Sequence, residues 1–172
     1  MNIAITSFLN SFAHVSVVID VLVIFSARIL PWLFLFFFFL ETLLLHTRNV
    51  KPFLYAFVVF LLSIKITALI KFFVALPRPF EFLEIINPLF IYKDLGSFPS
   101  GHALVFFALA MYSRHIHSKF STWYFLSAFL ISLSRVIAGV HFAYDIIFGA
   151  FLGILLSYTI VHILKHGTLE DV

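Results

Sequence analysis

Five long apolar segments constrain this chain more than any other feature. They cover residues 29–45, 53–76, 100 to the SRHIHSK sequence at 113–119, 122–138 and 142–164. Hydrophobic residues make up 63% of the chain, charged residues only 11%, and the mean hydropathy is +1.12. A soluble domain needs far more polar surface than this. Because a helix crosses a bilayer with about 20 residues, the sequence predicts an all-α integral membrane protein with a bundle of five transmembrane helices. The first and third of these spans are marginal in length.

The N-terminal region is less regular than the five spans. Residues 2–14 place apolar side chains on one helical face and polar ones on the other, as in a helix that lies in the membrane interface. Residues 15–25 are apolar but short, and Asp20 divides them. We therefore expect residues 1–28 to be interfacial or re-entrant, with a sixth span as the alternative, and residues 1–172 to form a single domain.

The composition also narrows the chemistry. The chain has no cysteine, which excludes disulfides, thiolate metal sites and a cysteine nucleophile. A net charge of +3 is explained by basic residues that flank membrane helices, and no basic surface segment interleaved with aromatics indicates a nucleic-acid partner. No cluster of carboxylates suits a metal ion, so neither a metal nor another cofactor is expected. The sequence leaves the oligomeric state open.

The placement of Lys and Arg predicts the orientation in the membrane. Basic residues occur at Arg48, Lys51, Arg114, Lys119 and Lys165, in two loops and after the last span. With five spans these positions share one side, which the positive-inside rule makes cytoplasmic. The connection 77–100 and the turn near Gly139 then face outward. Lys71, Arg78 and His102 lie at that same outer boundary.

Two features at this boundary suit an anion, a pair of basic residues and the PSGH sequence. Lys71 and Arg78 are seven residues apart, so they share a helical face if the helix continues past Pro77. The sequence PSGH at 99–102 places Ser100, Gly101 and His102 where the third span begins. Free backbone N–H groups at a helix N-terminus bind anions.

The sequence SRVIAGVHFAYD at 134–145 adds three polar side chains to the same boundary. Arg135 and His141 are six residues apart, which does not fit one helical face, and Gly139 between them favours a break. His141 and Asp145 are four apart and so are neighbours on the next helix. The cations match a phosphoryl group. Asp145 can fix the tautomer of a nucleophilic His141, and His102 can protonate the leaving oxygen.

These three sequences together resemble the signature motifs of the type 2 phosphatidic acid phosphatase (PAP2) superfamily. KFFVALPRP at 71–79, PSGH at 99–102 and SRVIAGVHFAYD match the patterns K-x6-RP, PSGH and SR-x5-H-x3-D without departure. The resemblance implies that His141 is the nucleophile that forms a phosphohistidine, with Asp145 as its partner and His102 as general acid. It implies phosphate binding by Lys71, Arg78, Ser100, Gly101 and Arg135.

Within that superfamily, the short chain is similar to small bacterial undecaprenyl-diphosphate phosphatases. The resemblance implies hydrolysis of undecaprenyl diphosphate to undecaprenyl phosphate at the outer face of the bacterial cytoplasmic membrane, with lipid phosphate and membrane lipids as partners. The alternatives are a phosphatidic acid or phosphatidylglycerol phosphate phosphatase, a lipid phosphotransferase, and a non-catalytic lipid-binding or transport protein. No motif explains Lys65, for which an internal ion pair and a substrate contact are both open.

Overall fold

The computed structural model describes residues 2–44, 49–91 and 96–166, with side chains up to residue 164. Its elements are α1 (Asn2–Asn10), α2 (Val17–Ile24), the π-helical η1 (Phe25–Ile29), α3 (Leu30–Leu44), α4 (Lys51–Val74), α5 (Pro79–Phe82), α6 (Gly101–His115), α7 (Ser121–Ile137) and α8 (Ala143–His166). No strand occurs in these residues, and the predicted all-α fold is confirmed. Arg48 and the side chain of Lys165 lie outside the described part.

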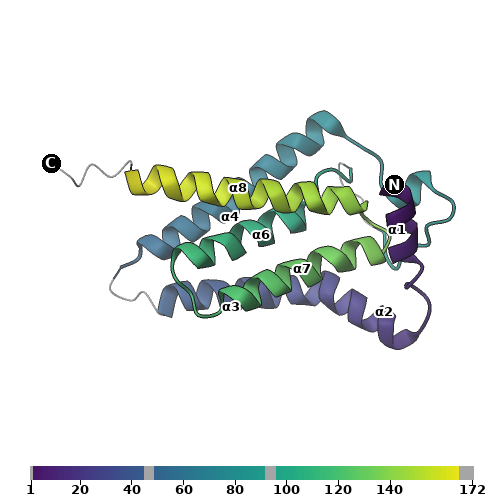
Figure 1. Cartoon of the computed structure of the whole chain (residues 1–172), viewed down its shortest axis with the longest axis horizontal. Coiled ribbons are helices and arrows are strands. Elements are labelled where there is room, and N and C mark those ends of the chain that lie inside the picture. The colour runs from purple at the N-terminus through teal and green to yellow at the C-terminus, as the bar shows by residue number, and fades with distance from the viewer. Residues whose placement is uncertain (1, 45–48, 92–95, 167–172) are drawn as a thin grey trace.

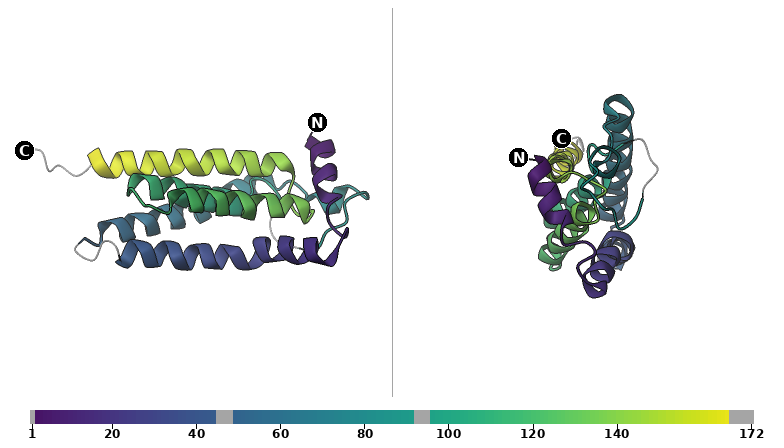
Figure 2. Two further views of the ribbon diagram at one scale, coloured as in Figure 1. Left: turned by 60° about the horizontal axis from the view of Figure 1, so that its bottom comes forward. Right: turned by 90° about the vertical axis from the view of Figure 1, so that its right-hand side faces the viewer.

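The first span is longer than the sequence predicts. The elements α2, η1 and α3 join into one helix over Val17–Leu44, so residues 17–28 form neither a re-entrant segment nor a span of their own. Asp20 marks the beginning of this helix instead of dividing it. It lies in the first turn, where a carboxylate is favoured, and accepts a hydrogen bond from the His14 amide. Only α1 remains separate, and it runs across one end of the bundle (Figures 1 and 2).

Three of the described helices have the length and apolar character to cross a membrane. These are Val17–Leu44, Lys51–Phe82 and Ala143–Leu164, while the apolar α7 is shorter. The second of these segments comprises α4 and the short α5, with a non-helical break at 75–78 between them. The 15 residues of α6 extend only about 22 Å, but α6 packs against α4, α7 and α8 and lies among them (Figure 1). The result is a five-helix bundle of an integral membrane protein.

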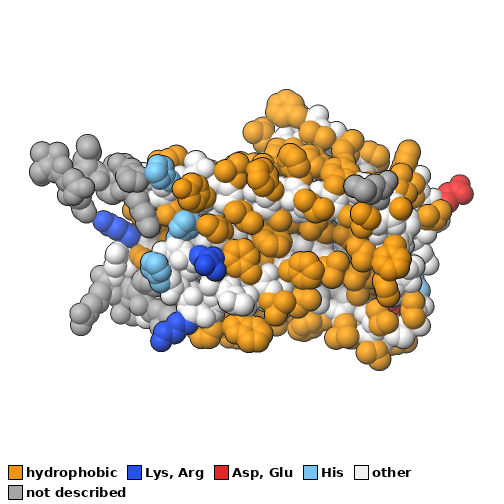
Figure 3. Space-filling view, in the orientation of Figure 1, with side chains coloured by type: hydrophobic (Ala, Val, Ile, Leu, Met, Phe, Trp, Pro, Cys, Tyr) orange, Lys and Arg blue, Asp and Glu red, His pale blue; other side chains and the backbone are white. Residues whose placement is uncertain are grey.

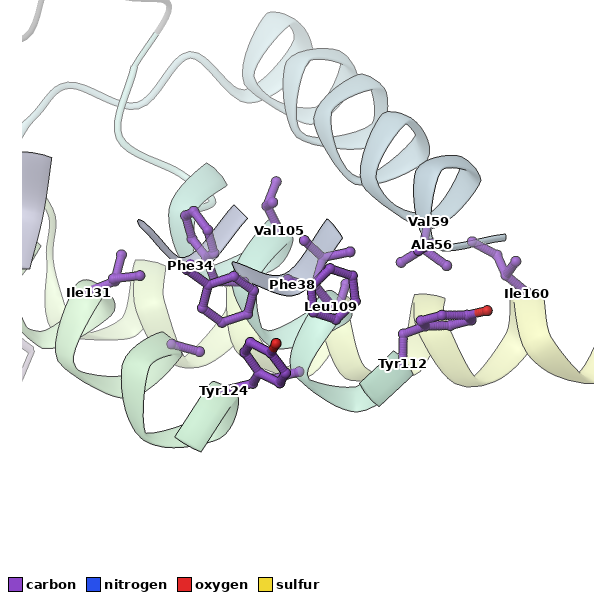
Figure 4. Close-up of a cluster of buried hydrophobic side chains, with 14 of the residues drawn as sticks. Phe34, Phe38, Ala56, Val59, Val105, Leu109, Tyr112, Tyr124, Ile131 and Ile160 are labelled. Carbon is purple, nitrogen blue, oxygen red and sulfur yellow. The ribbon is translucent and has the colours of Figure 1, made fainter. Parts of the chain in front are cut away.

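The bundle has an apolar exterior and an aromatic core. Side chains on the face in Figure 3 are mostly hydrophobic, and the Lys and Arg side chains visible there gather at the end where α8 terminates. Inside, the rings of Phe34 and Phe38 lie 5.0 and 5.2 Å from that of Tyr124 (Figure 4). These contacts hold α3 against α7 in the half of the bundle away from α1.

Two glycines bring the motif-bearing helix ends together. Gly149 on α8 packs so closely on α6 that an added Cβ atom would lie 2.7 Å from the Ser100 carbonyl oxygen. Small residues allow this approach of two helix backbones. Gly139 has φ +75°, a conformation that favours glycine, and it ends α7 before the chain turns into α8. The predicted break at Gly139 is thereby found.

Candidate active site

The three motifs converge at one end of the bundle. A cavity of about 340 Å³ lies between α4, α6 and the turn that follows α7. It is lined by Ile64, Thr67, Ala68, Lys71, Arg78, Gly101, His102, Val105, Arg135 and His141. Six of the eight residues singled out in the sequence therefore face one cavity. The other two, Ser100 and Asp145, are fully buried beside these residues.

His141, on the cavity wall, and Asp145, beside it, form a buried pair. The Nδ1 atom of His141 lies 3.3 Å from Oδ2 of Asp145, and the two side chains are 2% and 0% exposed. The same Oδ2 atom accepts a hydrogen bond of 2.9 Å from the Phe142 amide, which fixes the carboxylate. An imidazole held through Nδ1 has Nε2 left for chemistry.

The protonation of His141 is set by its surroundings. Burial is the main cause that holds the pKa of His141 well below its usual value of 6.5. The positive charges of Arg135, Arg78 and Lys71, in that order, lower it further. A cation is disfavoured both in a buried position and beside other cations. The side chain is therefore neutral at physiological pH, which is the state that a nucleophile requires.

Backbone carbonyls hold the three cations at the cavity. Lys71 Nζ donates a hydrogen bond of 2.8 Å to the Gly96 carbonyl oxygen, Arg78 donates to that of Val140, and Arg135 donates to that of Ala27 at 3.3 Å. All three side chains are at least nine-tenths buried. Anchors of this kind keep the positive groups in place before an anion arrives.

Arg78 reaches the cavity by a different route from the predicted one. We expected Lys71 and Arg78 on one helical face, but α4 ends at Val74 and Ala75 adopts a left-handed conformation with φ 41°. Arg78 instead caps α5, where its amide donates to Glu81. Proline at position 77 cannot supply the amide that a continuing helix needs. The connection, and not α4, therefore positions Arg78.

The beginning of α6 contributes the second histidine. Ser100 is the N-cap of α6, and its amide donates a 3.1 Å hydrogen bond to the Asp145 carbonyl oxygen. That bond ties the α6 N-terminus to α8. His141 itself lies in the turn before α8, which begins at Ala143, and not on that helix as the sequence predicts. Gly101 packs on Thr67 so closely that a Cβ atom would lie 3.0 Å from its Cγ2. His102 then occupies the first turn, with its side chain on the cavity wall.

Sequence reasoning missed the residues of α1 that hold the turn between α7 and α8, which we call the motif turn. Asn10 donates to the carbonyl oxygens of Asn87 and Ile137, at 3.1 and 2.9 Å, and accepts from the Asn87 amide. The buried Thr6 hydroxyl accepts from the amide of Ala143, the first residue of α8. The signal was the polar face of residues 2–14. This pattern indicates an amphipathic helix, but it does not indicate which groups the polar side chains bind.

Two further expectations can be placed in the structure. Lys65 is exposed on α4 and is not among the residues that line the cavity. Among residues 2–44, 49–91 and 96–166, no group of three or more His, Asp and Glu side chains lies together in a way that suits a metal ion.

The fold and the site define a membrane protein in which a neutral histidine and three cations surround one cavity at the end of a helical bundle. The sequence profile of the PAP2 superfamily matches residues 52–168, which include every motif residue. The chain belongs to the PAP2 superfamily, as the motifs predict.

Two curated relatives resemble parts of this chain. The undecaprenyl-diphosphatase of Sulfolobus acidocaldarius is 31% identical over 135 residues, which cover 76% of this chain and 64% of that protein. The bacitracin transport permease protein BcrC of Bacillus licheniformis is 35% identical over 78 residues, covering 45% of this chain and 38% of that protein. The chain thus matches less than two thirds of the length of each.

Two solved structures share the fold over nearly the whole chain. LpxE of Aquifex aeolicus superposes with a TM-score of 0.79 at 28% identity, covering 94% of each chain. The first transmembrane PAP2 type phosphatidylglycerolphosphate phosphatase from Bacillus subtilis gives a TM-score of 0.68 at 18% identity. That second match covers 98% of this chain and 88% of the other, and it supports the fold alone.

Proposed function

We propose that this protein is a lipid phosphate or diphosphate phosphatase that works through a phosphohistidine at His141. The observation that carries the proposal is the buried His141–Asp145 pair on a cavity whose other walls hold Lys71, Arg78 and Arg135. A neutral nucleophile beside three fixed cations suits attack on an anionic phosphorus centre. The preferred substrate is undecaprenyl diphosphate, which is supported by the likeness to the undecaprenyl-diphosphatase.

In the first step, the Nε2 lone pair of His141 attacks the terminal phosphorus. A nitrogen–phosphorus bond forms while the bond from phosphorus to the oxygen of the lipid leaving group breaks. His102 gives its proton to that oxygen. Asp145 accepts the Nδ1 proton in a hydrogen bond and stabilises the positive charge that develops on the imidazole, as the carboxylate of a catalytic triad does.

In the second step, water replaces the lipid. His102, now neutral, takes a proton from a water molecule, whose oxygen attacks the phosphorus. The nitrogen–phosphorus bond breaks, its electron pair returns to His141, and inorganic phosphate leaves. Both steps place negative charge on the phosphoryl oxygens, where Lys71, Arg78, Arg135 and the amides at the start of α6 bind it. We propose that these groups supply the charge stabilisation without a metal ion.

The location of the cavity suits a substrate that comes from the membrane. A second cavity of about 520 Å³ has mostly apolar walls from η1, α3, α4 and α6. It shares the residues Ile64, His102 and Val105 with the first. A hydrocarbon chain can occupy this space while its phosphate lies beside His141. The positive-inside rule supports an outward-facing site in the bacterial cytoplasmic membrane. Lys51, Arg114 and Lys119 lie at or near helix ends opposite the site.

The experiment is a phosphate-release assay of purified protein in detergent. The panel contains undecaprenyl diphosphate, phosphatidic acid and phosphatidylglycerol phosphate, each with and without a chelator. We expect the highest kcat/KM with undecaprenyl diphosphate, no effect of the chelator, and a loss of at least about 10⁴-fold in His141→Ala. His162→Ala, at the other end of α8, is the matched control and should keep its activity.

Each outcome bears on a different part of the proposal. Hydrolysis of phosphatidic acid alone would reject the undecaprenyl assignment and keep the phosphatase class. Release of no phosphate from any substrate, or full activity in His141→Ala, would reject the enzyme in favour of a non-catalytic lipid-binding protein. Transfer to a second lipid without release of phosphate would identify a phosphotransferase.

A further inference from the structure

Arg28 has a position that neither the motifs nor the proposed chemistry explains. It lies within the 28-residue apolar helix Val17–Leu44, and its side chain is exposed. An arginine among apolar side chains of a membrane helix is costly and marks a functional position by default. Arg28 also belongs to η1, the π-helical turn of that helix. Such single π-turns occur frequently at functional sites, because the extra residue turns a side chain out of the regular α-helical register.

The side chain of Arg28 lines the cavity beside the candidate active site. That cavity of about 520 Å³ is otherwise formed by Ala27, Pro31, Trp32, Leu35, Phe60, Ile64, His102, Val105 and Phe106. Arg28 is the one Lys or Arg residue in this lining. His102 also lines the phosphate cavity, so it stands on the wall that the two cavities share. Arg28 and His102 therefore line the same cavity, which adjoins the proposed phosphate cavity.

The Phe90 ring links Arg28 to Arg135, one of the cations of the first cavity. Its guanidinium carbon lies 4.5 Å from the centre of the Phe90 ring, and that of Arg135 lies 5.5 Å from the centre of the same ring. The carbonyl oxygen of Ala27, one residue before Arg28, accepts a hydrogen bond from Arg135. Cation–π contacts orient a guanidinium group and leave its N–H donors available at the ring edge. Two guanidinium groups, one at each cavity, thus contact the same aromatic ring.

We propose that Arg28 forms a second phosphate subsite, which makes the enzyme selective for lipid diphosphates over lipid monophosphates. The inference rests on the proposed phosphatase function. The terminal phosphoryl group lies among Lys71, Arg78 and Arg135, and the phosphoryl group bonded to the lipid lies on Arg28. The apolar walls around Trp32 and Phe60 then take the first part of the hydrocarbon chain.

The subsite also fits the charge changes of the first step. When the bond to the terminal phosphorus breaks, the leaving group of a diphosphate is a lipid phosphate, and its oxygens gain negative charge. His102 protonates the bridging oxygen, and Arg28 stabilises the charge that remains on the departing phosphate. A lipid monophosphate leaves as a neutral alcohol after protonation, so it draws no such benefit from Arg28.

The test compares one isoprenoid in two forms, its diphosphate and its monophosphate, so that the tail is constant. We expect Arg28→Ala to lower the ratio of kcat/KM for the diphosphate to that for the monophosphate by about 10²-fold. Arg28→Lys keeps the charge but loses the planar donor set, so its ratio should fall less. Arg114→Ala, which removes an exposed arginine at the end of α6, is the matched control and should leave the ratio unchanged.

A second measurement is independent of turnover of the lipid diphosphate. With the monophosphate as substrate, inorganic diphosphate should inhibit the wild type more strongly than inorganic phosphate, and Arg28→Ala should remove that difference. Equal losses for both substrates in Arg28→Ala, or an unchanged ratio, would overturn the subsite. A wild type that hydrolyses only the monophosphate would overturn the subsite and keep the phosphatase. A wild type that hydrolyses neither would reject the proposed function itself.

Discussion

Two buried carboxylates in opposite halves of the same bundle have very different surroundings. Glu41 lies in α3, where one oxygen accepts a 2.7 Å hydrogen bond from the Tyr124 hydroxyl and the other accepts from Ser118. Asp145 lies at the site end in α8, where a single oxygen contacts both the Phe142 amide and the His141 ring. Both side chains are at least nine-tenths buried.

The difference shows that burial of a charged group does not by itself identify an active site. The Glu41 cluster is closed, because each carboxylate oxygen already has a hydroxyl partner that joins α3 to α7 or to the loop before it. Asp145 contacts a histidine, and this histidine lines a cavity with three cations. We therefore propose a structural role for Glu41 and a positioning role for Asp145.

The largest expected effect separates these two carboxylates by activity. Asp145→Asn keeps the shape of the side chain. It removes the charge that, in the proposed mechanism, fixes the tautomer of His141 and stabilises the positive charge that develops on its ring during the reaction. We expect kcat to fall by about 10³–10⁴-fold. Glu41→Gln is the matched substitution in the other half and should keep kcat within about threefold. The measurement is phosphate release by the two purified variants. Equal losses of kcat in both would contradict the different roles of Asp145 and Glu41.

An intermediate effect is expected when stability is measured instead. Glu41→Gln replaces an acceptor oxygen with an amide donor beside a hydroxyl, so one buried hydrogen bond must rearrange or break. We expect the free energy of unfolding in detergent to fall by about 1–3 kcal/mol. Tyr124→Phe removes the donor of the same hydrogen bond and should act in the same direction. Unchanged unfolding in both variants would argue against a structural role for the cluster.

The smallest effect is a dependence of stability on pH that comes from His141. The pKa of His141 in the folded protein lies well below 6.5, the ordinary value that the unfolded chain keeps. As the pH falls through that value, the unfolded chain binds a proton that the folded protein does not, so stability falls with decreasing pH. Between about pH 7.5 and about pH 5, the wild type should lose more thermal stability than His141→Gln. Parallel losses would show that His141 is not held neutral by the fold.

The sequence predicts those parts of the fold and site that depend on local spacing. Hydrophobic segments mark where the spans lie, Gly139 marks the turn, and the four-residue spacing of His141 and Asp145 makes them neighbours. Prediction of these features requires only the geometry of a helix and the knowledge that a lipid bilayer surrounds the chain. The three motifs add the family, because their residues recur in a fixed pattern.

The remaining features depend on contacts between distant parts of the chain. Asp20 divides an apolar segment by composition, yet it only marks where a 28-residue helix begins. Thr6 and Asn10 hold the motif turn through hydrogen bonds, and Arg28 lies beside Phe90. Neither arrangement follows from a periodicity in the sequence. Hydrophobicity identifies a membrane helix but does not say which helix lies beside it, so these partners emerge only from the structure.

The most direct test of the central claim is to trap the covalent intermediate. The enzyme is mixed rapidly with a lipid phosphate labelled at the terminal phosphorus, stopped in alkali and digested for mass spectrometry. Alkaline conditions preserve a phosphohistidine, which acid hydrolyses. The mechanism predicts a transient phosphoryl group on His141 in the wild type and none in His141→Gln. Substrate turnover without any phosphorylated protein, or a label on a residue other than His141, would contradict it.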